Sequence, residues 1–336
     1  MMSLRAVGEW IALLLGALLL SALVVLVAGR DPGQALVALF DGAFGSRYGF
    51  LNVWTKACPL LLAGLAVTVA FRAGFWNIGA EGQIIVGAIV AGWLGTWPGI
   101  AAGLHPVLIL TGAFLAGAVW CMIAAWLKVR RGAFEVISTI LLNFIALYLL
   151  SWLVQGPLRE ASGAQPVGDP LVSGALLPRL FGRMYTLHAG ILLALAAMAA
   201  VHVFLSRTET GFHIRAVGGG PRAAAWAGIP VDRTLLLTAA VSGGLAGLAG
   251  AVEVMGVLGR LFDKVSPGYG FTAIAVALLA RLNPLALLPA ALFFGALEAG
   301  ASRLQQEADV SYVIVLVIQA VVILASVVIG RRRGGA

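Results

Sequence analysis

Four carboxylate side chains lie within or at the ends of apolar stretches of this sequence, those of Glu81, Glu135, Glu253 and Glu298. A charged group in an apolar segment is costly, so each one needs a structural or functional reason. Glu81 and Glu135 fall where helices are expected to begin, and the helix dipole stabilises an anion there. Glu253 lies deep in a glycine-rich stretch and indicates a functional or interhelical role, whereas Glu298 lies near a segment end and indicates a structural one.

Uncharged polar side chains accompany the first two acids. Asn77 and Gln83 flank Glu81, while Thr139 and Asn143 follow Glu135 along the chain. Ser138, Thr139 and Asn143 share roughly one face of a predicted helix. A hydroxyl in a membrane helix often bonds the preceding turn instead, so a structural role for each stays open. The aromatic pair Phe75-Trp76 next to Asn77 could stack on a flat ring, although aromatic residues are also common at membrane interfaces.

No set of residues with the spacing of a catalytic or metal site is visible. A P-loop needs Gly-Lys-Ser/Thr, and the lysines of this chain are followed by alanine or valine: Lys56, Lys128 and Lys264. The four histidines are scattered, and Cys58 and Cys121 lack metal-ligand spacing. We therefore predict no catalytic residue, no metal and no cofactor in this chain, so that any energy from ATP and Mg²⁺ must come through a partner.

These polar groups must be positioned by membrane helices. The chain has 336 residues, of which 61% are apolar and only 11% charged, far fewer charges than a soluble protein carries. The candidate spans are residues 10–29, 57–71, 82–97, 105–127, 134–154, 187–205, 234–258, 271–281, 284–300 and 311–330. The pattern predicts a single all-α membrane domain over residues 1–336, with about 8–10 transmembrane helices. We expect the first span to be retained, because it is long for a signal peptide.

Positive charge predicts the orientation of these spans. Basic residues crowd into short segments, residues 128–131, 206–233 and 331–333, which the positive-inside rule assigns to the cytoplasm. Both termini are then cytoplasmic, and residues 30–56 and 155–186 lie outside. The net charge of +8 fits loops near anionic lipid headgroups. We expect no nucleic acid as a partner, because no basic segment is interleaved with aromatic residues.

Two of the candidate spans, 57–71 and 271–281, are short for a membrane crossing. Each is followed by a break, Phe71–Asn77 after the first and Arg281–Pro284 after the second. Interrupted hydrophobic segments in both halves of a chain are typical of transporter substrate sites. Each of the two segments is therefore either a membrane crossing or half of a re-entrant hairpin.

The inner segment 206–233 has helix signals of its own. Pro221 suits a first helical position, Arg222–Ala227 is rich in helix formers, and Gly228 is placed for a left-handed C-terminal cap. We predict a glycine-rich hinge followed by a helix of about two turns, too short to be stable alone in water. The helix therefore lies against another surface, which from spacing alone is either its own protein or a partner.

The same segment carries a resemblance to a known family. Gly211–Ile229 resembles the coupling-helix region of permeases in bacterial ATP-binding-cassette (ABC) importers for nucleosides and simple sugars, within the branched-chain amino acid/ribose-type permease superfamily. Phe71–Gly87, Gly132–Tyr148 and Ser266–Gly300 are also similar to that family, in the same order. Gly219 and Gly220 differ, because the family usually has bulkier polar residues there.

The resemblance implies function and partners. It implies a permease subunit in the cell (inner) membrane that works by alternating access with a second related permease, a two-cassette ATPase and an extracytoplasmic solute-binding lipoprotein. The implied solute is a nucleoside, with a simple sugar as the alternative. The predicted solute pathway is lined by Phe75, Trp76, Asn77, Glu81, Gln83, Ser138, Thr139, Asn143, Glu253 and Tyr269. The predicted ATPase contact comprises Arg215, Gly218, Pro221, Arg222, Ala223, Ala224, Gly228 and Ile229.

Two other classes of protein fit the sequence less well. In an ion-coupled secondary transporter Glu253 would carry the coupling ion, but no second intramembrane acid lies near it in the sequence. An intramembrane enzyme would need paired acids or a nucleophile with its base, and neither is visible. A capped helix in a short cationic loop favours the ABC permease.

Overall fold

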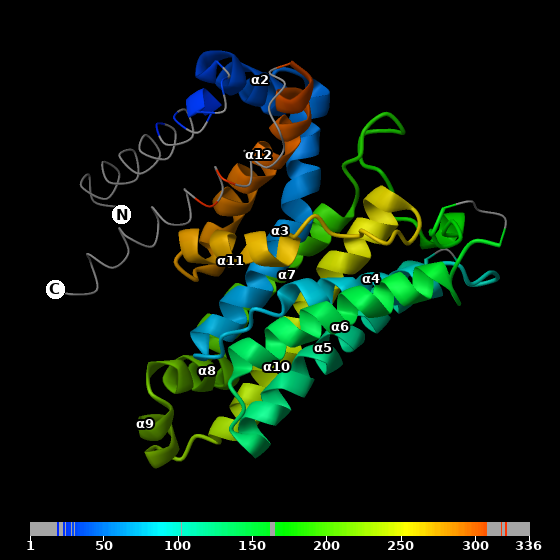
Figure 1. Ribbon diagram of the computed structural model, residues 1–336. Coiled ribbons are helices and arrows are strands. Elements are labelled where there is room, and N and C mark those ends of the chain that lie inside the picture. The colour runs from blue at the N-terminus through cyan, green and yellow to red at the C-terminus, as the bar shows by residue number, and fades with distance from the viewer. Residues whose placement is uncertain are drawn as a thin grey trace. The chain divides into compact units, whose positions relative to one another are not determined.

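The computed structural model describes residues 31–307 apart from 102 and 162–164, together with positions 19, 23, 25–27, 29, 317 and 320. The predicted spans 10–29 and 311–330 lie almost wholly outside the described residues. The α-helices are α2 (Pro32–Phe44), α3 (Arg47–Arg72), α4 (Ala80–Leu94), α5 (His105–Arg131), α6 (Glu135–Gln155), α7 (Gly190–Arg207), α8 (Glu209–Gly219), α9 (Pro221–Trp226), α10 (Val231–Glu253), α11 (Tyr269–Leu279) and α12 (Leu287–Glu307) (Figure 1). Short 3₁₀ turns cover Ser173–Ala175 and Pro284–Ala286, and a π-helical turn, η2 (Val254–Leu258), extends α10.

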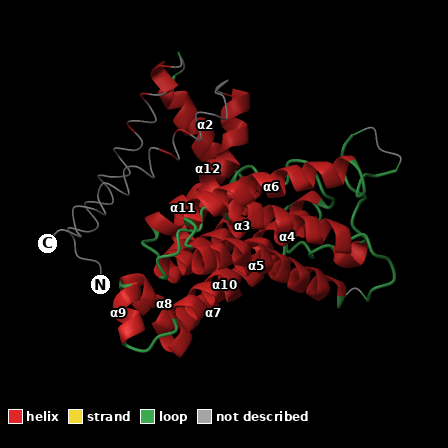
Figure 2. Cartoon of the chain, turned by 60° about the horizontal axis from the view of Figure 1, so that its bottom comes forward, coloured by secondary structure: helices red, strands yellow, loops and turns green. Residues whose placement is uncertain are grey.

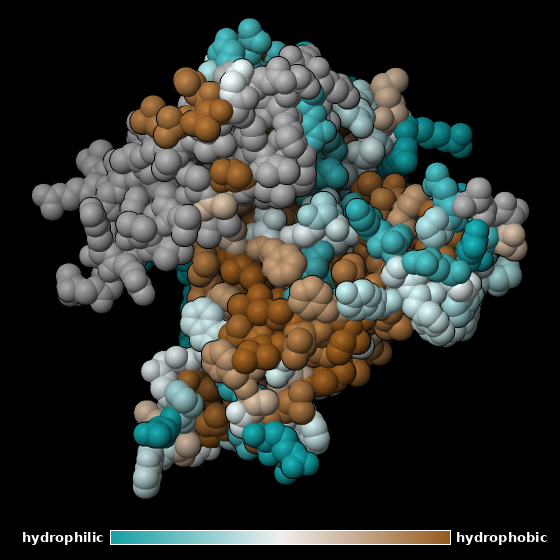
Figure 3. All heavy atoms as spheres, viewed as in Figure 1, coloured by the Kyte–Doolittle hydropathy of each residue, from teal (hydrophilic) through white to brown (hydrophobic). Residues whose placement is uncertain are grey.

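The named elements of the described residues are all helices, joined by loops and without a named strand (Figure 2). Six of its helices are long and apolar enough to cross a membrane, and α4 and α11 are shorter apolar helices. Figure 3 shows apolar surface over α5 and α6, with more polar residues toward α9 and toward the loops at the opposite end. Large side chains such as Leu141, Tyr148 and Trp152 of α6 are exposed there, as lipid contact requires. The predicted all-α, multi-pass membrane fold is confirmed.

The chain divides into two compact units. The larger unit, Cys58–Ala291, is built around α10, which lies beside α4 and α5. Small residues allow these helices to approach closely, the usual way in which membrane helices pack. A Cβ on Gly243 would overlap the carbonyl oxygen of Gly117, and one on Gly250 would overlap the carbonyl oxygen of Ile84. These glycines are therefore required for the packing.

The smaller unit contains residues 1–57 and 292–336. In its described part, α2 packs on α12 through Gly42 and Gly300, where a Cβ would collide with the facing helix. Ala43, Val53 and Ala299 form a small apolar cluster within this unit. Residues 30–56, which we expected to be an outer segment, are thus mostly helical, and residues 47–56 are the beginning of α3.

The interrupted helices differ from the prediction in one respect. Residues 57–71 are not a short span, because α3 is 26 residues long and begins at Arg47. In the first half of the chain the short apolar helix is α4, with 15 residues, and it follows the non-helical segment 73–79. The second short helix, α11, has 11 residues, as expected. After it the chain turns through Arg281 and Leu282, which have φ of 52° and 55°, values that cost a non-glycine residue free energy.

The segment after α7 is two consecutive helices, and the predicted glycine hinge is wrong. Gly218 and Gly219 belong to α8, so that only Gly220 separates α8 from α9. Gly218 is needed for packing, because its backbone contacts the carbonyl oxygen of Arg72 at the end of α3. The predicted short helix that begins at Pro221 is confirmed as α9, with Pro221 at its first position and Gly228 at a φ of 81°.

Candidate functional site

The non-helical segment 73–79 connects α3 to α4, and Asn77 holds it in place. The fully buried Asn77 amide donates to Gln83 Oε1 and to Ser242 Oγ, each at 3.0 Å. Its carbonyl oxygen accepts from the backbone N–H of Gly79 and from Gln83 Nε2, also at 3.0 Å. Ser242 on α10 passes the connection on by donating to the Ala66 carbonyl oxygen of α3. All the hydrogen-bonding groups of Asn77 are thereby paired within the protein.

Helix α6 supports the same segment from the other side. Thr139 Oγ1 accepts from the Ile78 N–H at 3.3 Å. Asn143 Nδ2 donates to the Ile78 carbonyl at 3.0 Å, and Asn143 Oδ1 accepts from the Gly82 N–H at 2.8 Å. Ser138 does not join them, because its hydroxyl bonds the Phe134 carbonyl of its own helix. The residues that satisfy the broken backbone are therefore one turn apart on α6.

Glu81 lies where two short helices begin. It is in the first turn of α4, is 8% exposed, and accepts a 2.7 Å hydrogen bond from the backbone N–H of Gly270 in the first turn of α11. The Ser266 hydroxyl also faces this carboxylate, while its oxygen accepts from the Tyr269 N–H. Two helix N-termini thus meet at one carboxylate, a geometry that stabilises a negative charge within apolar surroundings.

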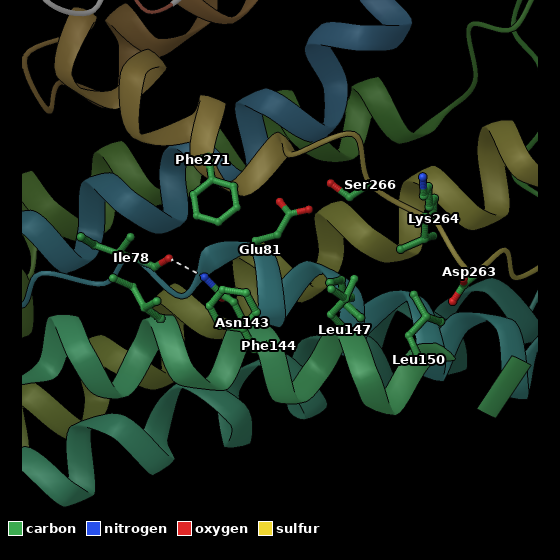
Figure 4. Close-up of a pocket in the computed structure, with 13 residues that line it drawn as sticks. Ile78, Glu81, Asn143, Phe144, Leu147, Leu150, Asp263, Lys264, Ser266 and Phe271 are labelled. Carbon is green, nitrogen blue, oxygen red and sulfur yellow. Dashed lines mark hydrogen bonds between the residues drawn. The ribbon is translucent and has the colours of Figure 1, made fainter. Parts of the chain in front are cut away.

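A cavity of about 370 Å³ opens beside Glu81, between α4, α6, α11 and the loop that precedes α11. Figure 4 shows Phe271 of α11 and Phe144 of α6 on opposite walls, Glu81 between them, and Asp263 and Lys264 toward one end. Most of the remaining lining is aliphatic, and the size is within the range of small-molecule sites. The cavity lining is Ile78, Glu81, Ile85, Ile140, Asn143, Phe144, Leu147, Leu150, Asp263, Lys264, Val265, Ser266 and Phe271.

The other residues predicted for the solute pathway do not line this cavity. Phe75, within segment 73–79, is fully buried, with Lys128 Nζ 5.8 Å from its ring centroid. Trp76 is 51% exposed and packs against Phe71. Glu253, at the end of α10, is buried, and Tyr269 is 2% exposed in the first turn of α11. Of the ten predicted residues, only Glu81 and Asn143 contribute to the lining.

Sequence reasoning missed Phe144, Phe271 and the Lys128–Glu135 pair. Lys128 Nζ lies 2.5 Å from Glu135 Oε1, so Glu135 has a cation as partner as well as a helix N-terminus. The short loop between α5 and α6 was a signal for that pair, since it places the two residues seven apart. No local signal marks Phe144 or Phe271, because their common cavity joins segments far apart in the sequence.

The second candidate region is the α8–α9 arm. Ala224 and Ile229 are buried against their own chain, whereas Arg222 and Ala223 are exposed. Trp226, which was not among the predicted contact residues, is 93% exposed on a helix of six residues. A fully exposed tryptophan is typical of an interface anchor.

Among the described residues no group of histidine, cysteine and acidic side chains is arranged to hold a metal.

One further titratable group is buried at the end of the molecule that carries the loops. His188 precedes α7, is 1% exposed, and accepts from the Gly190 N–H through Nδ1. Its ring packs on Gly256 in the π-helical turn, where a Cβ would clash with it. Burial, and secondly the nearby Arg179, lower the pKa of His188 to about 4. The neutral ring therefore belongs to the packing between this loop and η2.

Broken helices around a cavity, with a short exposed helix at one end, define a membrane permease. The chain belongs to the family described as branched-chain amino acid transport system / permease component, which it matches over residues 49–327. The resemblance seen in the sequence is confirmed, and the chain is a permease subunit of the ABC transporter class.

Individual relatives carry more specific names. The glucose ABC transporter permease protein TsgB13 of Haloferax volcanii is 36% identical, over 95% of this chain and 88% of its own length. The guanosine ABC transporter permease protein NupP of Bacillus subtilis is also 36% identical, over 94% of this chain and 90% of its own. A second Bacillus subtilis protein, the guanosine ABC transporter permease protein NupQ, is 29% identical over 71% of this chain and 77% of its own. No solved structure matches the chain significantly.

Proposed function

We propose that this chain is one permease of a nucleoside importer. It works with a second related permease, a two-cassette ATPase that binds ATP and Mg²⁺, and an extracytoplasmic solute-binding lipoprotein. The observation that carries the proposal is the similarity to two permeases named for guanosine from one organism, over 94% and 71% of this chain. Membership of an ABC permease family removes the reason for an ion-coupled carrier. Glu253 then needs no role as a coupling acid.

A simple sugar is the second candidate solute, because TsgB13 is as similar to this chain as NupP. The two are separated by uptake into proteoliposomes that contain all subunits and ATP. Labelled adenosine, guanosine and uridine should accumulate, and unlabelled ribose or glucose should not compete. Uptake of ribose or glucose without uptake of any nucleoside would overturn the choice.

Coupling to the ATPase is proposed to pass through α9. The exposed face of this helix contains Arg222, Ala223 and Trp226, while Ala224 is turned toward its own chain. Replacing Ala224 would therefore disturb the arm itself, and Trp226 is the informative position. Removing a tryptophan anchor that becomes buried in an interface typically costs at least about 2 kcal/mol of binding free energy.

The coupling test compares Trp226→Ala with Trp152→Ala. Trp152 is 62% exposed on α6, so it is a matched control for loss of an exposed tryptophan. Trp226→Ala should reduce ATPase co-purification roughly 30-fold in affinity terms and lower uptake, with normal membrane insertion. Equal ATPase binding by both variants would place the docking surface elsewhere, for example at residues 128–133.

The proposed orientation has both termini in the cytoplasm, with the α8–α9 arm on the same side. Single cysteines at positions 213 and 165, in a chain without Cys58 and Cys121, test it with an impermeant thiol reagent. Position 213 should react only from the cytoplasmic side and position 165 only from the other. Labelling of 213 from outside would contradict the orientation.

A further inference from the structure

We propose that the cavity between α4, α6 and α11 binds a ribonucleoside directly, with a ribose hydroxyl donating to the Glu81 carboxylate and the base lying against Phe144 and Phe271. This inference rests on the proposed function and adds to it the groups that recognise the solute. It starts from an unusual feature of the cavity, which is a carboxylate retained among otherwise aliphatic and aromatic walls.

The carboxylate is placed for a polar solute. A cavity that only faces lipid chains would gain nothing from a buried acid, because charge at that depth is costly. Here two helix N-termini offset that cost, through the first turn of α4 and the Gly270 N–H of α11. Within the described residues the partners of Glu81 are N–H and O–H groups of the chain, without an ion pair. The N–H groups of Gly270 and Gly268 and the Ser266 hydroxyl already face this carboxylate, and a carboxylate can accept about four hydrogen bonds, so capacity for one further donor is left for a solute.

The chemistry of the lining selects the class of solute. An ionised carboxylate only accepts hydrogen bonds, so the matching group is a donor such as a hydroxyl of a ribose. The amide of Asn143 is occupied at both ends by the backbone of Ile78 and Gly82. Apart from Glu81 and Ser266, the inner walls are therefore apolar, and Asp263 and Lys264 lie toward one end (Figure 4).

This distribution fits a nucleoside better than a hexose or a nucleotide. A hexose carries hydroxyls on all sides, and each one buried without a partner costs free energy. A nucleoside separates its hydroxyls, on the sugar, from a flat ring that can pack on Phe144 and Phe271. A phosphate group would bring a second negative charge to the inner carboxylate, which like-charge repulsion disfavours. The cavity volume of about 370 Å³ is near the lower end for small-molecule sites, as a small solute requires.

The test is photolabelling of the assembled transporter in lipid nanodiscs without the lipoprotein, so that only the membrane subunits select the ligand. The probe is 8-azidoadenosine, and labelled peptides are located by mass spectrometry. Label should appear within residues 140–150 and 266–275, and adenosine should displace it. We expect 2′,3′-dideoxyadenosine to compete about tenfold less well, the ratio for losing one charge-assisted hydrogen bond. AMP and glucose should compete less well still.

Three variants and one control separate recognition from folding. Glu81→Gln keeps an acceptor for the Gly270 N–H and should reduce the preference for adenosine over its dideoxy analogue to a few-fold or less. Phe144→Ala and Phe271→Ala, at half-exposed positions, should lower labelling at least about threefold by loss of ring packing. Ile145→Ala is the control, since Ile145 is 53% exposed on α6 and does not line the cavity. If Glu81→Gln fails to assemble, the two phenylalanine variants and the competitor series still decide.

Distinct outcomes overturn distinct claims. Label that adenosine cannot displace would show an apolar surface for lipid chains and refute the inference. Equal competition by adenosine and the dideoxy analogue would refute the role of Glu81. If the complete transporter takes up nucleosides while the cavity stays unlabelled, this inference fails and the proposed function stands. If it takes up no nucleoside at all, the proposed function fails.

Discussion

Replacement of Asn77 by alanine should destabilise the larger unit by removing the clamp on segment 73–79. The change deletes four buried hydrogen bonds, two from Nδ2 and two to Oδ1. Ser242 keeps its bond to the Ala66 carbonyl, so three groups lose a partner: both ends of the Gln83 amide and the Gly79 N–H. At about 1–2 kcal/mol for each such group the loss is about 3–6 kcal/mol. At the lower value of about 0.6 kcal/mol per bond found in membranes, it is still about 2 kcal/mol.

The measurement is the free energy of unfolding in mixed micelles titrated with denaturing detergent. Ser138→Ala is the control, because that hydroxyl only bonds the preceding turn of its own helix, and it should change the free energy by less than about 0.5 kcal/mol. In the double variant Asn77→Ala/Gln83→Leu the cost should be less than the sum of the two single changes. Equal stability of Asn77→Ala and Ser138→Ala would refute the clamp.

Three further outcomes follow from the described contacts. Lys128→Met should lower the free energy of unfolding by about 3–5 kcal/mol by leaving the Glu135 carboxylate buried without its cation, and Lys128→Met/Glu135→Gln should recover most of it in the same titration. Gly243→Leu should prevent close packing of α10 on α5, seen as loss of folded protein on size-exclusion chromatography, whereas Gly219→Leu, with open space around it, should not. Because the folded pKa of His188 is about 4, below the ordinary value near 6.5, the unfolded chain binds the proton more tightly. The contribution of the neutral His188 ring to the free energy of unfolding is therefore complete above pH 6.5 and is lost as pH falls toward 4. The loss is about 2 kcal/mol by pH 5, and a His188→Gln variant that shows the same pH dependence would contradict this origin.

The sequence predicts much of the fold because the signals for membrane helices lie within short stretches of the chain. Long apolar stretches, the break at 73–79 and the proline and glycine around α9 all act within a few residues. Helix α3 was predicted too short because Asn52 and Lys56 interrupt its apolar pattern before residue 57, although the helix continues through both. Gly218 and Gly219 of α8 were interpreted as part of a hinge, while the close contact of Gly218 with the end of α3 lies outside any local pattern.

The candidate site is less predictable, since its contacts are distant in the sequence. Glu81 and Gly270 are 189 positions apart, and Asn77 and Ser242 are 165 apart. The sequence shows which polar residues are unusual in a membrane segment, but it does not show which of them are already hydrogen-bonded within the protein. Asn77 and Gln83 are paired with each other, and Asn143 with the backbone, whereas Glu81 borders open space. The exposure of Trp226 depends on the phase of a helix of six residues, which no periodicity can establish.

Arg72 connects the α8–α9 arm to the turn that follows α11. Its carbonyl oxygen rests against the backbone of Gly218 on the α8–α9 arm, and its Nε donates to the carbonyl oxygen of Leu282 at 2.9 Å. Leu282 lies in the strained turn that follows α11, and the other end of α11 touches Glu81. A displacement of the arm must therefore carry this turn with it or break one of two contacts at a single residue. The path from the exposed Trp226 on α9 to the cavity wall on α11 passes only through α8 and the end of α3.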